Sequence, residues 1–261
     1  MTRPEIAVLK TDGTNCEEEM ANAFKVGGAT PSIVHVNELR EGTKKLSDFG
    51  GLGLPGGFAN GDDLKSGKIL ANELTSLLSD QLQEFVEAEK PIIGVCNGFQ
   101  VLIRSGLLPF GSLGEQQMTL TDNEKGSFHC RWIDLKVGES ACWFVQPGDF
   151  DALTIPMQTA HGEGRFFGNK TYTANLLENN QVVFQYSTPE GELAHGNFPE
   201  NPNGSAEDIA GICDASGLIL GMMPHPERSL EAFHPYRPRT EVARNASKII
   251  FENFVDFARG D

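Results

Sequence analysis

Short apolar runs and longer amphipathic stretches alternate along the first 105 residues of the chain. Apolar runs that predict buried strands lie at residues 5–9, 31–36, 52–54 and 91–95. Stretches with helical spacing lie at residues 15–27, at 63–89 in one or two pieces, and from Asn97 onward. This alternation predicts βαβ units, and therefore an α/β fold with a doubly wound, mostly parallel sheet and helices on both faces.

The first predicted helix carries signals at both ends. Asn15 and Glu18, three residues apart, resemble a capping box, and the glutamates at residues 17–19 crowd the first turn. Gly27 and Gly28 predict the end of the helix, because glycine readily adopts the left-handed conformation that follows a last helical turn.

The pattern changes after Leu113. Alternating runs at residues 128–137 and 182–186 predict a small antiparallel addition, residues 198–205 read as a loop, and strands return at 208–212 and 217–221. The C-terminal segment predicts a helix whose apolar face comprises Val242, Ala246, Ile249, Ile250, Phe254 and Phe257. We find neither a repeat nor a linker, so residues 1–261 are predicted to form a single domain.

Charge and composition exclude several classes of function. The formal net charge of −15 argues against binding to nucleic acid or to an anionic membrane surface. No apolar run is long enough to span a bilayer, and the first residues do not resemble a signal peptide. Five widely spaced cysteines, an odd number without a C-x-x-C pair, indicate a reducing compartment, and we expect a cytoplasmic protein.

Cys96 is the first candidate for chemistry. It lies in the sequence GVCNG (residues 94–98), where a predicted strand gives way to a predicted helix. A glycine two residues to either side leaves room for a sharp turn that exposes a nucleophile, and a helix N-terminus favours an anionic sulfur. The alternative is a buried structural cysteine, because such a short motif also occurs by chance.

His225 and Glu227, in the sequence GMMPHPER, are the candidate base and its orienting group. In an extended segment, residues two apart share a face, so Glu227 can accept a hydrogen bond from one imidazole nitrogen. The other nitrogen then faces Cys96, which completes a triad of nucleophile, base and orienting carboxylate. The alternatives are an exposed loop histidine and a pair of metal ligands; since no third ligand is placed by spacing, we predict no metal.

With these three residues identified, the chain resembles the class I glutamine amidotransferases, and among them the glutaminase subunits of phosphoribosylformylglycinamidine synthase, an enzyme of purine biosynthesis. The motifs that carry the resemblance are DGTNCE, LPGGFANGDDL, GVCNGFQ, FHCRW, AHGEGRF, NPNGS followed by IAGI, and GMMPHPER. They extend from residue 12 to residue 228, so the resemblance covers nearly the whole chain.

The resemblance implies a role for each matching residue. Cys96 would form a glutamyl thioester, His225 would transfer protons and Glu227 would hold the imidazole. The remaining implied positions form the oxyanion hole and bind glutamine: the Gly56-Gly57-Phe58 turn, the backbone N–H of Asn97, Gln100, and His161 with Gly162.

The resemblance also implies a partner. The chain lacks a G-x-x-x-x-G-K-[ST] loop, so the expected ATP and Mg²⁺ would be used by a synthetase subunit, with a small third subunit and no cofactor in this chain. Segments near 142–154 and 234–240 look longer than in compact members of the family. The alternatives are a glutaminase subunit of another amidotransferase, a γ-glutamyl hydrolase or peptidase-like relative, and a docking subunit with an inactive site.

Overall fold

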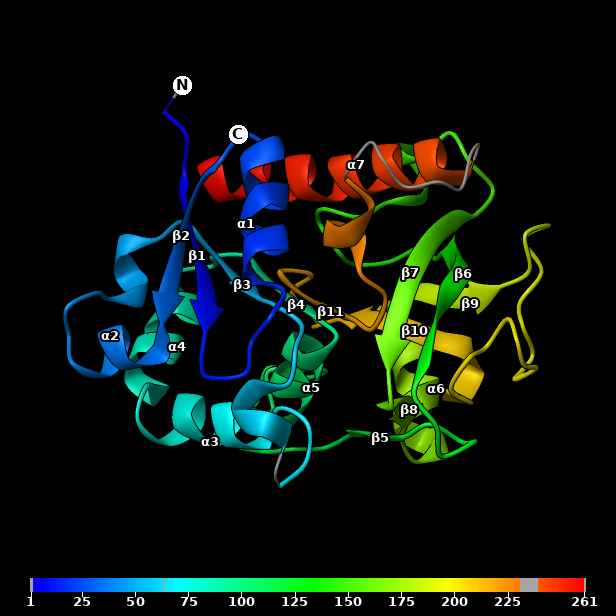
Figure 1. Ribbon diagram of the computed structural model, residues 1–261, viewed down its shortest axis with the longest axis horizontal. Helices are drawn as coiled ribbons and strands as arrows, with labels where there is room; N and C mark the ends of the chain where they lie inside the picture. The colour runs from blue at the N-terminus through cyan, green and yellow to red at the C-terminus, as the bar shows by residue number, and fades with distance from the viewer. Residues whose placement is uncertain (1, 63, 231–238, 261) are drawn as a thin grey trace.

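In a computed structural model, which describes residues 2–62, 64–230 and 239–260, one nine-stranded sheet runs through the molecule (Figure 1). The strand order is β2-β1-β3-β4-β11-β10-β9-β6-β7. The doubly wound α/β architecture predicted from the sequence is confirmed, because consecutive strands of the first half are parallel and joined by helices.

The parallel half of the sheet contains five strands. They are β1 (Glu5–Lys10), β2 (Thr30–His35), β3 (Gly51–Leu54), β4 (Ile92–Val95) and β11 (Ile219–Met222). Residues of β3, β4 and β11 are buried throughout, as expected for parallel strands covered on both faces. Their carboxyl ends lie at one edge of the sheet, where α/β proteins bind their ligands.

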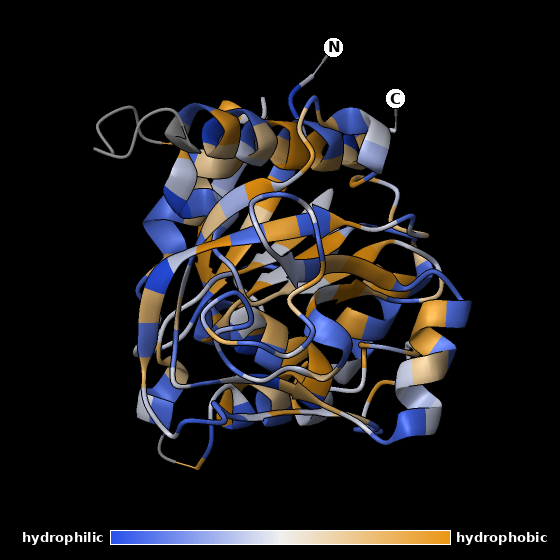
Figure 2. Cartoon of the chain, turned by 90° about the vertical axis from the view of Figure 1, so that its right-hand side faces the viewer, coloured by the Kyte–Doolittle hydropathy of each residue, from blue (hydrophilic) through white to orange (hydrophobic). Residues whose placement is uncertain are grey.

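The antiparallel half continues the same sheet. Its strands are β10 (Ile209–Cys213), β9 (Val182–Ser187), β6 (His129–Val137) and β7 (Ile155–His161). A separate two-stranded sheet pairs β5 (Thr119–Asp122) with β8 (Glu163–Phe167). Figure 2 shows the apolar residues of the central strands gathered inside the molecule, with hydrophilic residues along the outer loops and helices.

Helices cover both faces of the sheet. On one face α1 (Glu17–Val26) packs against α7 (Arg239–Arg259), where the ring of Phe24 lies 5.2 Å from that of Phe251. The opposite face carries α3 (Lys68–Ser76), α4 (Ser79–Glu87) and α5 (Asn97–Arg104) (Figure 1). Two further helices lie at the periphery, α2 (Val36–Arg40) and α6 (Lys170–Glu178). The short 3-10 helices are η1 (Leu46–Asp48), η2 (Ala59–Asp62), η3 (Pro147–Asp149), η4 (Ala206–Asp208) and η5 (Pro226–Ser229).

The predicted capping box at the start of α1 is wrong. The helix begins at Glu17, its N-cap is Cys16, and no side chain caps it. The chain is held here instead by the Cys16 N–H, which donates to the Gly56 carbonyl at 3.3 Å. The predicted end is confirmed, since Gly27 is the C-cap; a Cβ there would lie 2.7 Å from the Phe251 carbonyl oxygen.

The apolar face predicted for the C-terminal helix is rotated in the structure. Val242 is 36% exposed, and Ile249 and Phe257 are only partly buried. The buried face contains Ala243, Ala246, Ser247, Ile250, Phe251, Phe254 and Val255. The sequence pattern supports either face, and contact with α1 and η5 selects this one.

The structure tests two further predictions, the helical stretch over 63–89 and the two longer segments. The helical stretch predicted over 63–89 forms two helices, α3 and α4. Of the two longer segments, 142–154 is loop around η3, whereas residues 231–238, which include most of the second, lie outside the described residues. Among the helices that the structure describes, we find none with the length and apolar character needed to cross a bilayer.

Candidate active site

Cys96 lies at the junction of β4 and α5 in a strained backbone conformation. Its φ of 52° and ψ of −105° belong to a region that costs a non-glycine residue about 1–3 kcal/mol. The turn is fixed by the Cys96 N–H, which donates to the Met222 carbonyl of β11 at 2.8 Å. The residue is 7% exposed, so the expectation of an exposed thiol is wrong: the sulfur lies at the wall of a small cavity.

The two glycines of GVCNG are explained by close backbone contacts. A Cβ at Gly98 would lie 1.9 Å from the Leu54 carbonyl oxygen of β3, and a Cβ at Gly94 would lie 2.7 Å from the Gly98 carbonyl oxygen. Both distances are shorter than any allowed contact. The glycines therefore let the first turn of α5 lie directly on the sheet, which aims the helix N-terminus at Cys96.

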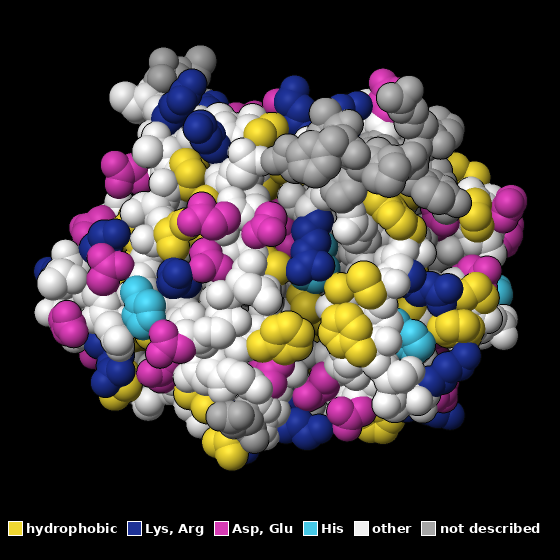
Figure 3. Space-filling model, in the orientation of Figure 1, with side chains coloured by type: hydrophobic (Ala, Val, Ile, Leu, Met, Phe, Trp, Pro, Cys, Tyr) yellow, Lys and Arg dark blue, Asp and Glu magenta, His cyan; other side chains and the backbone are white. Residues whose placement is uncertain are grey.

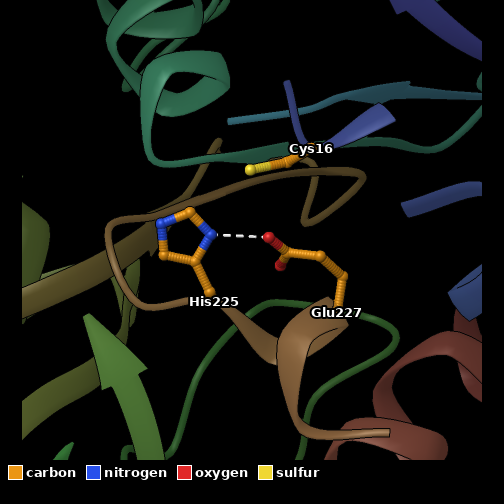
Figure 4. Close-up of side chains that lie close together, drawn as sticks. All are labelled: Cys16, His225 and Glu227. Carbon is orange, nitrogen blue, oxygen red and sulfur yellow. Dashed lines mark hydrogen bonds and ion pairs between the residues drawn. The ribbon is translucent and has the colours of Figure 1, made fainter. Parts of the chain in front are cut away.

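His225 and Glu227 form a buried pair (Figure 4). The His225 Nδ1 and a Glu227 carboxylate oxygen are 2.5 Å apart, and both side chains are nearly inaccessible to solvent. The predicted contact is present, but the predicted reason is wrong, because Glu227 lies in η5, a 3-10 helix with Pro226 at its start, and not in an extended segment. The His225 N–H donates to the Gln158 carbonyl of β7 at 2.8 Å, which fixes the histidine backbone.

The charge state of His225 is set by competing effects. Burial lowers its pKa, but the charges of Glu227 and Cys96 outweigh burial and raise the pKa well above the usual value. Since Nδ1 is held by Glu227, the proton to be transferred is on Nε2, which makes no hydrogen bond with any residue that the structure describes. An imidazolium beside a thiolate is the ion pair that a cysteine nucleophile requires.

A cavity of about 120 Å³ brings most of the predicted residues together. Its wall includes seven of them: Gly57, Phe58, Cys96, Gln100, His161, Gly162 and His225. Gly56, Asn97 and Glu227 lie behind this wall. A Cβ at Gly56 would lie 2.8 Å from the His225 ring and 3.4 Å from the Cys96 Cβ, so only glycine leaves space for both side chains.

One of the N–H groups predicted to form the oxyanion hole already has a hydrogen-bond partner. The Phe58 N–H donates to the Gly13 carbonyl at 3.0 Å, which leaves the N–H groups of Gly56 and Gly57 as candidates in this turn. Gly57 has a φ of 136°, and a Cβ there would lie 2.6 Å from the Asn15 nitrogen. The Asn97 N–H is at the first position of α5, where backbone donors have no partner within the helix.

A polar network forms the wall beyond Cys96. Gln100 donates from Nε2 to the Glu163 carbonyl and accepts from Asn97 Nδ2 at 3.3 Å, while Arg104 holds the Glu163 carboxylate at 2.9 Å. Asn97 Nδ2 also donates to Asp62, whose pKa is raised by burial. Gln100 therefore ties α5 to β8, and two carboxylates, Asp62 and Glu163, border the cavity.

His161 presents an acceptor to the cavity. The Asn123 side-chain amide donates to the Ser127 and His161 carbonyls, so its oxygen accepts from His161 Nδ1 at 3.0 Å. Burial, with smaller effects from the charges of His225 and His129, lowers the pKa of His161 to about 3. The ring is therefore neutral, and its unprotonated Nε2 is available to accept a hydrogen bond from a ligand.

The NPNGS loop stabilises the strand that carries this part of the site. The Asn201 side-chain oxygen accepts from the backbone N–H groups of Gly204 at 2.8 Å and Ser205 at 3.2 Å. Asn203 Nδ2 donates to the Gly164 carbonyl at 2.8 Å. This irregular loop thus buries its polar groups in bonds to itself and to the AHGEG segment.

Sequence reasoning missed Cys16 and Arg228, although both lie in motifs quoted above. Arg228 Nη2 donates to Cys16 Sγ at 2.9 Å, and Cys16 lies beside the His225–Glu227 pair (Figure 4). Spacing could not reveal this contact, because 212 residues separate the two side chains in sequence. Asp62, Asn123 and Phe128 were missed for the same reason.

Cys16, His225 and Glu227 offer three potential metal ligands within 4.8 Å of one another. Their existing contacts argue against that use. His225 Nδ1 is bonded to Glu227, and the cationic guanidinium of Arg228 contacts the Cys16 sulfur, where it would repel a metal ion. These contacts suit a general base with its orienting groups better than a metal site.

Comparison with known proteins agrees with the site. The family model of the CobB/CobQ-like glutamine amidotransferase domain matches residues 3–258, so the chain belongs to this class of amidotransferases. A Methanococcus maripaludis protein, phosphoribosylformylglycinamidine synthase subunit PurQ, is 44% identical over 253 residues, 95% of this chain and 92% of that protein. PurQ of Dehalococcoides mccartyi is 40% identical over 262 residues, 99% of each chain. Within its class, the chain belongs to the PurQ family.

Solved structures support the same assignment. A chain in the structure of PurLQS from Thermotoga maritima matches with a TM-score of 0.74 and 29% identity, covering 98% of this chain and 99% of that one. A second Thermotoga maritima glutamine amidotransferase, at 14% identity and a TM-score of 0.55, shares the fold alone. The family resemblance inferred from the motifs is confirmed.

Proposed function

We propose that this chain is the glutaminase subunit of phosphoribosylformylglycinamidine synthase. It hydrolyses glutamine and passes ammonia to a synthetase subunit, which converts formylglycinamide ribonucleotide to formylglycinamidine ribonucleotide in purine biosynthesis. The observation that carries the proposal is the buried His225–Glu227 pair beside Cys96, in a chain 44% identical to a PurQ subunit.

The first half-reaction releases ammonia. The Cys96 thiolate attacks the side-chain amide carbon of glutamine, and the oxyanion is stabilised by the Asn97 N–H and by an N–H of the Gly56-Gly57 turn. His225 Nε2 then gives its proton to the amide nitrogen. The C–N bond breaks, ammonia leaves and a glutamyl thioester remains on Cys96.

The second half-reaction regenerates the thiol site. His225, now neutral, takes a proton from a water molecule, which attacks the thioester carbonyl. The C–S bond breaks, glutamate leaves and the thiolate–imidazolium pair is restored. Glu227 holds the imidazole in one orientation throughout. The unprotonated Nε2 of His161 is placed to accept a hydrogen bond from the ammonium group of glutamine.

Ammonia must then reach the synthetase without entering water, where it would become unreactive ammonium. Phe58 and Phe128 line the cavity and remain 49% and 54% exposed, so they offer an apolar rim for a partner subunit. Figure 3 shows large apolar side chains gathered near the middle of one face of the molecule, among charged ones. In this proposal ATP and Mg²⁺ bind the synthetase, a small third subunit completes the complex, and this chain uses no cofactor.

We place this activity in the cytoplasm, because Cys16, Cys96, Cys130, Cys142 and Cys213 all carry free thiols, which suits a reducing compartment. The net charge of −15 leaves no role for nucleic acid or an anionic membrane.

The test is glutamine hydrolysis by the purified chain, alone and with the synthetase subunit and its ligands. We expect slow hydrolysis by the free chain and a large increase in the complex, because free activity would discard ammonia. The Gly56-Gly57 turn is the candidate switch, since loss of one oxyanion donor costs roughly 10²–10³-fold in rate. Equal kcat in both states would contradict the switch. Absence of hydrolysis in both would contradict the proposed function.

A further inference from the structure

The His225–Glu227 pair has a second sulfur beside it. Cys16, the residue before α1, is buried, and its Sγ lies within 4.8 Å of ligating atoms of both His225 and Glu227. A Cβ at Gly56 would lie 3.4 Å from Cys16 Sγ, 3.4 Å from Cys96 Cβ and 2.8 Å from the His225 ring. Two thiols, those of Cys16 and Cys96, therefore lie close to the His225 imidazole, and the proposed mechanism uses only the thiol of Cys96.

The Cys16 thiol is satisfied on both sides. Its hydrogen can be donated to the Asn15 side-chain oxygen at 3.3 Å, and its sulfur accepts from Arg228 Nη2 at 2.9 Å. Arg228 is cationic, since burial alone would lower its pKa but the nearby Cys16 and Glu227 raise it. The sulfur therefore holds one end of a guanidinium group at a fixed place in the wall of the cavity.

The position of the Arg228 guanidinium is important because the Glu227 carboxylate lies next to it. Arg228 Nε lies 3.9 Å from the same Glu227 oxygen that accepts from His225 at 2.5 Å. The other carboxylate oxygen of Glu227 is buried and has no hydrogen-bond partner among the described residues. A guanidinium prefers a paired contact with both carboxylate oxygens, so Arg228 competes with His225 for Glu227.

We propose that Cys16 is a positioning residue of the reaction: its thiol keeps the Arg228 guanidinium beyond hydrogen-bond distance of Glu227, so that the carboxylate remains bonded to His225. This inference rests on the proposed function. Without Cys16, Arg228 moves onto Glu227 as a paired contact, and the imidazole loses both its orientation and the negative charge that keeps it protonated. Among the residues that the structure describes, the titratable and charged groups around His225 are Glu227 in η5, Cys96 before α5, Cys16 before α1 and His161 at the end of β7, with Arg228 beyond Glu227.

The experiment uses the chain assembled with its synthetase subunit. The pH dependence of kcat and KM for glutamine hydrolysis is measured for wild type, Cys16→Ala, Cys16→Ser, Arg228→Gln and the double variant Cys16→Ala/Arg228→Gln. Cys142→Ser is the matched control, because Cys142 is an equally buried thiol outside the cavity. Circular dichroism and thermal unfolding establish that each variant folds.

We expect Cys16→Ala to lower kcat about 10–100-fold, the cost of misplacing a reacting group, with a smaller change in KM. The alkaline limb of its profile moves to lower pH, because the imidazolium loses its proton more readily. Cys16→Ser retains an acceptor for Arg228 and recovers most of the rate. The double variant is faster than Cys16→Ala, since the competing guanidinium is gone. Cys142→Ser keeps the wild-type rate and profile.

A structural role for Cys16 predicts a different result. In that case the alkaline limb does not move, and adding Arg228→Gln leaves Cys16→Ala equally slow or slower; either outcome overturns the inference while the proposed function stands. A wild-type complex without glutaminase activity would overturn the proposed function and this inference with it. Titration of the His225 imidazole by NMR on ¹⁵N-histidine-labelled chain gives the same answer without turnover: its pKa falls in Cys16→Ala and is unchanged in Cys142→Ser.

Discussion

Two strand-to-helix turns bring a thiol close to His225, and they differ in backbone conformation. Cys96, between β4 and α5, has a φ of 52° and a ψ of −105°, a strained conformation, and its side chain lines the cavity. Cys16, between β1 and α1, has a φ of −114° and a ψ of 17°, so its φ is negative, as in most residues that carry a side chain. The positive φ of Cys96 makes the first turn the more strained of the two, and strain of this kind concentrates at reacting groups.

The helix ends at the two turns also differ in charge. The first turn of α5 has no acidic residue, so no carboxylate of that turn offsets the positive end of the helix beside Cys96. The first turn of α1 carries Glu17, Glu18 and Glu19, which offset the same effect beside Cys16. Closeness to a base therefore does not by itself make a nucleophile. In the proposed mechanism, the local backbone and the local field select Cys96 as the sulfur that reacts, and Cys16 positions its neighbours.

The largest effect that this comparison predicts is at Cys96. Replacing Cys96 with Ala should remove glutamine hydrolysis, a loss of about 10⁴-fold or more, because the proposed thioester forms on this sulfur. Synthesis from ammonium salts by the complex should continue, since that chemistry belongs to the synthetase. The two assays together check the prediction. Wild-type glutaminase turnover in Cys96→Ala would mean that the comparison assigns the nucleophile to the wrong turn.

The base and its orienting group should differ in importance. His225→Ala should lower kcat about 10²–10⁴-fold, because proton transfer is needed in both half-reactions. Glu227→Gln should be milder, since it retains the position of the ring while removing a charge. It should also move the alkaline limb of the pH–rate profile to lower pH, because Glu227 raises the pKa of His225. A Glu227 variant much slower than His225→Ala would contradict these roles.

The absence of a side chain at Gly98, in the Cys96 turn, should be essential for the stability of the fold. Gly98→Ala places a Cβ 1.9 Å from the Leu54 carbonyl oxygen, and we expect a loss of about 3 kcal/mol in the free energy of unfolding, as in overpacked cores. Gly148→Ala is the control, because a Cβ there meets nothing within 4 Å. Urea denaturation measures both. Equal stability of the two variants would show that the turn does not lie directly on β3.

The smallest effect concerns His161, whose ring is neutral where that of His225 is protonated. Its folded pKa of about 3 is below that of an unfolded histidine, so the unfolded chain binds a proton first and stability is lost as pH falls below about 6.5. His161→Gln should reduce this loss by about 1 kcal/mol per pH unit between roughly pH 6 and pH 4. Urea denaturation across that range checks it, and parallel curves for both proteins would refute it.

Much of this arrangement was accessible from the sequence, for identifiable reasons. The fold follows from alternating periodicities, and Cys96, His225 and Glu227 from local motifs whose chemistry is recognisable. The predictions that are wrong depended on choices between local alternatives. The capping box needed Asn15 to cap α1, but pairing with the Gly56 carbonyl selects Cys16.

Other features arise only from tertiary packing. The contact of Cys16 with Arg228 depends on loops that lie at opposite ends of the chain and meet at the sheet edge. Contacts with α1 and η5 determine which face of α7 is buried. The hydrophobic pattern of this helix is compatible with several rotations about its axis, so the sequence alone does not specify the buried face. Similarly, the neutral state of His161 follows from burial that no motif encodes.

The loop over residues 198–205 has a consequence for the time scale of motion behind the cavity. Its backbone is irregular, yet the Gly204 and Ser205 amides are bonded to the buried Asn201 side chain, and Asn203 is bonded to the strand behind His161. Amide hydrogens bound in this way exchange with solvent only when the surrounding unit opens. The Gly204 and Ser205 amides should therefore exchange as slowly as those of β9 and β10. A segment without regular secondary structure would then open on the same time scale as the sheet.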